Sequence, residues 1–80
     1  MIRKIEKKLK VDLDEAVNLY NQAFEEDSKL DEAIAKSKQL ILDYPSASEP
    51  YFILSLIALR LSDEGHAIEM CEAAHKLDPE

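Results

Sequence analysis

The chain has 80 residues, 46% of them hydrophobic, which fits one small domain and excludes a disordered chain. It contains one Gly and three Pro, and so few helix breakers favour an all-α fold. The net charge is −7, but residues 1–10 alone carry five basic residues against one acid, which leaves a charge of −11 for residues 11–80. This negative charge argues against a nucleic-acid partner, because phosphates repel an acidic protein.

The first predicted helical region covers residues 2–26, where apolar residues recur at steps of three and four. This pattern fits one long helix or two helices separated near residues 11–12. Asp12 followed by Glu15 has the spacing of a capping box, so we expect a break or a bend there. The apolar stripe consists of Ile2, Ile5, Leu9, Leu13, Ala16, Tyr20 and Ala23.

A second helix is predicted from Ser28 to the residues before Pro45. Ser28 is expected as its N-cap, and Asp31 and Glu32 then lie in the first turn, where the helix dipole favours negative charge. Pro45 ends the helix, because the residue before a proline is disfavoured in the helical region.

Two further helices complete the prediction. The third starts at Ser48 as N-cap with Pro50 in its first turn, and it is apolar almost all round from residue 51 to 61. We therefore expect it to be central and the most buried. The fourth begins at Ser62 or Asp63 as N-cap and ends before Pro79; its apolar residues are Ala67, Ile68, Cys71, Ala74 and Leu77.

Two periods connect these helices. The tetrapeptide LDEA occurs at residues 13–16 and again at 30–33, a step of 17 residues. A second spacing of 34 residues separates Ala33 from Ala67 and Pro45 from Pro79. Because 17 is half of 34, we expect one LDEA to start a first helix and the other to start the second helix of the same unit; the alternative is that the first copy belongs to the second helix of a lost upstream repeat. A helix–turn–helix period of about 34 residues is typical of tetratricopeptide repeats.

The chain resembles the tetratricopeptide repeat (TPR) family over residues 14–80. The segment YFILSLIALRLSDEGHAIEMCEAAHKLDP carries the pattern best, and residues 14–45 are a weaker copy. The resemblance implies a right-handed solenoid fragment of antiparallel helical hairpins, with repeat 1 at about 14–47, repeat 2 at about 48–80, and residues 1–11 as a basic helix or extension. Small or polar residues replace expected larger ones at Val17, Ser37, Ala58 and Cys71. A plain helical bundle, or the related three-helix domain that binds membrane-remodelling filaments, therefore remains open.

In that family, the first helix of each repeat lines a groove that holds a peptide or another protein. The resemblance implies a protein-interaction or assembly module without enzymatic activity or a cofactor. It does not imply the family's clamp for a terminal carboxylate, because Phe52 and Leu56 stand where basic or amide groups are needed. The partner-binding positions carried over are Asn18, Gln22 and Glu25 from the first unit and Phe52, Leu56 and Leu59 from the second.

The apolar third helix needs a cover for Phe52, Ile53, Leu56 and Leu59, because apolar surface left in water is costly. Three covers are open: residues 2–9 of the same chain, a second copy that makes a homodimer, or a segment of a partner protein.

The remaining reactive side chains favour structural roles. Cys71 and His75 are four residues apart, but a structural zinc site requires four ligands and no second pair is present. Cys71 is expected to be a small buried residue, and His75, which replaces Ile41 of the first unit, is expected to meet water at the end of the array. No nucleophile–base pair or glycine-rich phosphate loop appears in the sequence.

The predicted location is the cytoplasm, since the single Cys provides no disulfide framework and the basic start lacks a following apolar core. The longest apolar stretch, residues 51–61, is about half as long as a membrane span requires. The alternative function is a membrane-surface adaptor, in which the basic segment MIRKIEKKLK lies on anionic lipid.

Overall fold

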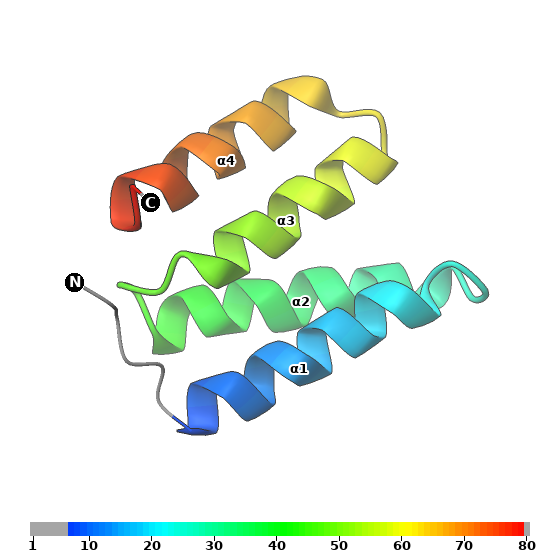
Figure 1. Cartoon of the computed structure of the whole chain (residues 1–80). Coiled ribbons are helices and arrows are strands. Elements are labelled where there is room, and N and C mark those ends of the chain that lie inside the picture. Colours follow the sequence, from blue (N-terminus) through cyan, green and yellow to red (C-terminus); the bar gives the residue numbers. More distant parts are fainter. Residues whose placement is uncertain (1–6, 80) are drawn as a thin grey trace.

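Residues 7–79 fold into four α-helices arranged as two antiparallel hairpins (Figure 1). The computed structural model describes residues 7–79, and within this range it contains no strand. The predicted all-α fold is thus confirmed for this part of the chain. The helices are α1 (Lys7–Gln22), α2 (Ser28–Asp43), α3 (Glu49–Arg60) and α4 (Glu64–Leu77).

α1 is continuous from Lys7 to Gln22, so the predicted break near residues 11–12 is wrong. Asp12 does not cap a new helix. Its carboxylate instead points to α2, where it accepts a hydrogen bond from the Tyr44 hydroxyl and lies 3.6 Å from Lys36 Nζ. The capping-box spacing of Asp12 and Glu15 therefore reflects a pair of contacts between two helices.

The ends of α2 agree in part with the prediction. The helix ends at Asp43, before Pro45, as expected. Its start differs, because Ser28 is the first helical residue and Asp27 occupies the N-cap position with a helical backbone and no capping hydrogen bond from its side chain.

α3 and α4 begin at the predicted caps. Ser48 precedes α3 and Pro50 lies in its first turn, although the Ser48 side chain makes no capping hydrogen bond. Asp63 is the N-cap of α4, and its Oδ1 accepts a hydrogen bond from the backbone N–H of His66 at 3.2 Å. Ser62, which joins the two helices, has a φ of 60°, in the left-handed region that non-glycine residues rarely adopt.

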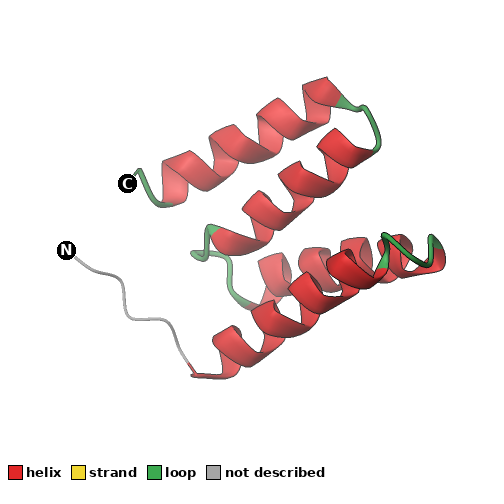
Figure 2. Cartoon of the chain, turned by 45° about the vertical axis from the view of Figure 1, so that its right-hand side comes forward, coloured by secondary structure: helices red, strands yellow, loops and turns green. Residues whose placement is uncertain are grey.

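Alanine makes the close helix contacts. The helices approach closely where small side chains meet, and the larger core residues fill the space between. α3 is central, because it contacts the other three helices, whereas α4 contacts α3 alone (Figure 2). The buried alanines are Ala16, Ala23, Ala33, Ala47, Ala58, Ala67 and Ala74, and the larger buried residues are Leu9, Leu13, Leu40, Ile53 and Ile57.

The two hairpins are also joined by polar and aromatic contacts at one end of the bundle. The Arg60 side chain, at the end of α3, donates a hydrogen bond to the Ala23 carbonyl oxygen just after α1. The same guanidinium group lies over the ring of Phe24, which meets Tyr20 edge to face at a centroid distance of 5.4 Å. These contacts fix the end of α3 against the end of α1.

Candidate interaction surface

Three large apolar side chains lie exposed in a row along α3. Phe52, Leu56 and Leu59 are 56%, 37% and 55% exposed. Their spacing of four and then three residues puts them on one helical face. The other side of α3 is buried against its neighbours, so α3 is central and has the most buried residues of the four helices, as predicted, while this one face stays exposed. We call Phe52, Leu56 and Leu59 the α3 stripe.

The predicted binding residues of the first unit are polar and exposed. Asn18 and Gln22 lie one turn apart on α1, which packs against α3. Glu25 lies beyond the end of α1, in the turn that leads to α2, so it is not on the helix with the other two. The structure thus places Asn18 and Gln22 on a helix that contacts α3, and Glu25 in a loop.

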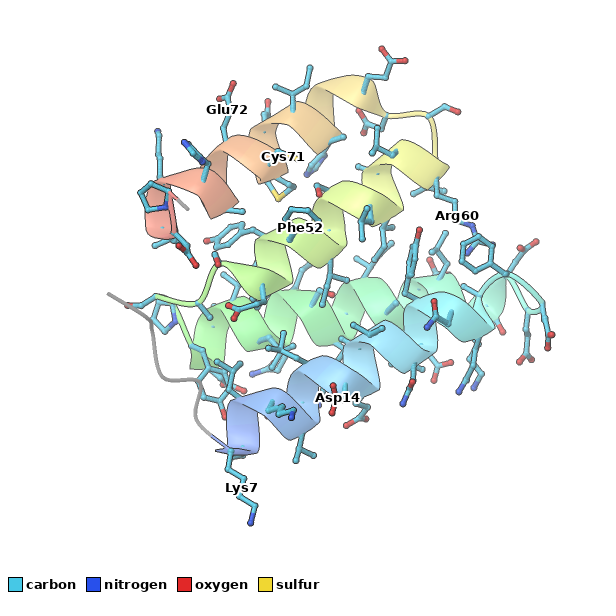
Figure 3. All side chains as sticks on the ribbon, in the orientation of Figure 1. Lys7, Asp14, Phe52, Arg60, Cys71 and Glu72 are labelled. Carbon is cyan, nitrogen blue, oxygen red and sulfur yellow. The ribbon has the colours of Figure 1, made fainter. Side chains whose placement is uncertain are left out.

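A groove of about 380 Å³ lies between α3 and α4 and shares Leu59 with the α3 stripe. Figure 3 shows Cys71 on the side of α4 that faces α3. The prediction that Cys71 is buried is wrong, because its side chain is exposed in this groove. We call this feature the α3–α4 groove; its lining residues are Leu59, Glu64, Ala67, Ile68, Cys71 and Glu72.

Five of these groove residues were not predicted as binding residues: Glu64, Ala67, Ile68, Cys71 and Glu72. The apolar pattern of the fourth helix is wide, and of its residues Cys71 was expected to be buried and His75 to meet water. Because α4 contacts only α3, however, it buries a narrow strip that includes Ala67 and Ala74. The polar His75, at the place that Ile41 holds in the first unit, is the signal in the sequence that could have indicated this exposed outer face.

A second hollow, of about 180 Å³, lies between α2 and α3 near the start of α4. Ile34 and Leu54 line it, together with the exposed Leu61 and the polar side chains of Lys38 and His66. It contains one lysine, one histidine and Asp63, whereas the α3–α4 groove contains carboxylates as its only charged groups.

The basic start of the chain is described only in part. Lys7, Lys8 and Lys10 are exposed on the first turns of α1, and Leu9 between them is buried in the core. Leu9 therefore does not cover the α3 stripe, and residues 2–6 of the predicted cover by residues 2–9 lie outside the described residues. Among residues 7–79, no helix is long and apolar enough to cross a membrane.

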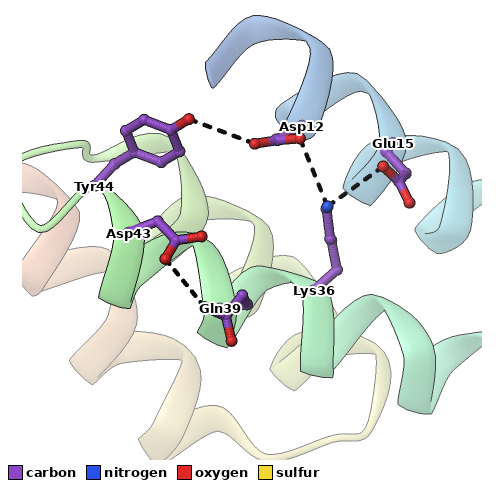
Figure 4. A network of polar contacts seen from close by, with 6 residues as sticks. All are labelled: Asp12, Glu15, Lys36, Gln39, Asp43 and Tyr44. Carbon is purple, nitrogen blue, oxygen red and sulfur yellow. Dashed lines mark hydrogen bonds and ion pairs between the residues drawn. The ribbon is translucent and has the colours of Figure 1, made fainter. Parts of the chain in front are cut away.

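Lys36 on α2 joins a polar network with α1 (Figure 4). Its Nζ lies 3.3 Å from Glu15 Oε2 and 3.6 Å from Asp12 Oδ1. Desolvation lowers the pKa of Lys36, but the hydrogen bonds and negative charges of Glu15 and Asp12 together outweigh it, so this pKa is raised above its ordinary value. Nearby, Gln39 donates a hydrogen bond to Asp43 on the same helix. The network ties α1 to α2 and lies away from the groove.

The titratable side chains of residues 7–79 form no group of three or more His, Cys, Asp or Glu residues with the geometry to hold a metal ion. His66 Nδ1 lies 3.7 Å from its helix cap Asp63, and His75 is exposed on α4, as predicted. The exposed features that favour binding are thus apolar: the α3 stripe and the α3–α4 groove.

No protein-family model matches the chain, and no similar curated protein or solved structure is found.

Proposed function

We propose that this chain is a protein-interaction module that binds a segment of another protein along the α3 stripe, without catalysis. The observation that carries the proposal is the exposure of Phe52, Leu56 and Leu59 on a helix whose other face is buried. Apolar positions spaced four and three residues apart match the face that one helix presents to a partner in a groove. Covering these side chains would contribute about 1.5–3 kcal/mol for each one fully buried.

We further propose that the four helices are two degenerate tetratricopeptide-like repeats. Two observations support this proposal. Ala33 and Ala67, 34 residues apart, are both fully or almost fully buried, one in the second helix of each hairpin. The first helices of the two hairpins, α1 and α3, are also in contact, which a stack of repeats requires.

In this arrangement, Asn18 and Gln22 of α1 form the polar side of the binding surface and the α3 stripe forms the apolar side. Amide side chains donate and accept hydrogen bonds, so they suit the backbone of a bound segment. Glu25, in the loop after α1, adds a negative charge at the end of the surface.

A random-peptide display library, selected on the immobilised protein, tests this function. We expect enriched peptides to bind Leu56→Glu at least about tenfold more weakly than wild type, because a charge in the α3 stripe opposes apolar contact. The matched control is Leu42→Glu, which places the same charge on an exposed apolar position of α2. Circular dichroism checks that both variants stay folded.

The proposal is wrong if no peptide is enriched, or if Leu56→Glu and Leu42→Glu bind the enriched peptides equally. Light scattering over a concentration series tests the alternative that the chain forms a homodimer. A mass that doubles with concentration in wild type, and stays monomeric in Leu56→Glu, would show that a second copy is the partner of the α3 stripe.

A further inference from the structure

The α3–α4 groove combines an apolar floor with carboxylates and contains no basic residue in its lining. We propose that this groove binds an apolar, lysine- or arginine-bearing helical segment of a partner protein. This inference rests on the proposed function and adds the chemical class of the partner. It also extends the binding surface from α3 to α4.

The apolar part of the groove is accessible. Ile68 is 59% exposed and Leu59 is 55% exposed, while Ala67 lies buried between α4 and α3. Cys71, one turn after Ala67, adds a small side chain that leaves room above the floor. Large apolar side chains of a partner can therefore lie between Leu59 and Ile68, next to the α3 stripe.

The negative charge of the groove favours a partner with basic residues. Glu64 and Glu72 lie eight residues apart on α4, which is about 12 Å along the helix axis. Basic residues seven or eight positions apart on a partner helix have the same separation and face, so they can pair with both carboxylates. The lining contains no lysine or arginine that would neutralise these carboxylates from within the chain. Complementary charge of this kind favours fast and selective association.

The same charges oppose a symmetric homodimer through this groove. In a two-fold dimer, each surface patch contacts its own copy. Glu64 and Glu72 of one chain would then lie near Glu64 and Glu72 of the other, and like charges facing each other are unfavourable. A separate cationic segment avoids this repulsion, so we assign the groove to a partner protein.

Two designed peptides test the assignment by fluorescence anisotropy. The first is a helical peptide of about 18 residues with Leu on one face and Lys elsewhere, and the second has Glu in place of every Lys. We expect the Lys peptide to bind at least about tenfold more tightly than the Glu peptide, with an affinity that falls as salt is raised.

Two double variants distinguish binding by the groove carboxylates from attraction to the general negative charge of the protein. Glu64→Gln with Glu72→Gln removes the groove carboxylates, and the control, Glu26→Gln with Glu69→Gln, makes the same change in net charge at exposed positions outside the groove lining. We expect the first pair to weaken Lys-peptide binding at least fivefold and to flatten its salt dependence. The control pair should change it less than twofold.

Equal losses in the two pairs would show non-specific charge attraction and overturn the inference, as would equal binding of the Lys and Glu peptides. A second pair of variants tests the floor: Ile68→Ser should weaken binding, whereas Leu42→Ser on α2 should not. If the mass of the wild-type protein without peptide doubles with concentration, and that of Ile68→Ser stays monomeric, the groove would be assigned to a second copy instead. If the display peptides still depend on Leu56 but the Glu64 and Glu72 changes have no effect, the proposed function stands and this inference fails.

Discussion

The guanidinium carbon of Arg60 lies 4.1 Å from the centroid of the Phe24 ring, over its face. Arg60 ends α3, and Phe24 follows α1, so this contact joins the two hairpins across 36 residues of sequence. The same guanidinium donates to the Ala23 carbonyl oxygen, while its Nη1 is buried without a hydrogen-bond partner among residues 7–79. A favourable cation–π contact is therefore partly offset by an unsatisfied buried donor.

Replacing Arg60 with Met should destabilise the chain by about 1–2 kcal/mol, because it removes the cation–π contact and the charge-assisted hydrogen bond. Phe24→Leu should cost about 1 kcal/mol for the same contact. The double variant should lose less than the two single losses combined, by about 0.5–1 kcal/mol, since both remove one shared interaction. Urea unfolding measures all three, and strict additivity would show that the two side chains do not interact.

The stability that the polar network between α1 and α2 contributes should depend on pH, because Lys36 titrates. Its pKa is raised in the folded chain, so its stabilising effect is fully present below the unfolded pKa of about 10.4 and is lost as the pH rises through the folded value. Lys36→Met should therefore lower the free energy of unfolding by about 0.5–1 kcal/mol at neutral pH, and this difference should shrink above about pH 10.4. Urea titrations at several pH values measure the difference. Lys38→Met, at an exposed position of the same helix, is the control, and a constant difference for Lys36 would contradict the prediction.

At the α3–α4 turn, two residues are not of the type that their backbone conformation favours. Ser62 has a positive φ, which suits glycine, whereas Gly65 lies in the first turn of α4 with no atom within 4 Å of an added Cβ. Ser62→Gly and Gly65→Ala should each stabilise the chain by about 0.5–1 kcal/mol. Thermal and urea unfolding measure the gains. Ser62→Ala is the comparison, because it keeps the strained backbone and should give no gain.

A buried hydroxyl in α2 lowers the stability of the chain. Ser37 is fully buried, and its Oγ has no hydrogen-bond partner within residues 7–79. Burying an unsatisfied polar group costs about 1–3 kcal/mol, so Ser37→Ala should raise the free energy of unfolding by about 0.5–2 kcal/mol. Ser55→Ala is the contrasting variant, since the Ser55 hydroxyl donates to the Phe52 carbonyl at 2.6 Å. A loss of stability in Ser37→Ala would indicate that its hydroxyl is satisfied after all.

Much of the fold could be predicted because its signals are local. Proline ended α2, Asp63 capped α4, and the helical apolar period gave the helices themselves. The predicted break in α1 was wrong because the spacing of Asp12 and Glu15 is the same for a helix cap and for two residues that reach a lysine on another helix. Local sequence does not distinguish these two uses.

The candidate site could be predicted only in part for the same reason. The sequence indicated an apolar α3 with more apolar surface than two hairpins can cover, and Phe52, Leu56 and Leu59 are indeed exposed. Ile53, which was expected to need a cover with them, is instead buried in the core of the chain itself. It did not indicate that Ile68 and Cys71 would join them, because the width of the apolar face of α4 says nothing about how many neighbours that helix has.

The sequence by itself determined the helical class, the approximate helix ends and the charge asymmetry between the basic start and the acidic remainder, because these depend on residue type and short-range spacing. Only the tertiary structure decided which apolar residues are covered. Burial depends on the neighbours of each helix: α3 has three, and α4 has one. The single neighbour of α4 leaves Ile68, Cys71 and the carboxylates beside them on the surface, and this arrangement produces the groove.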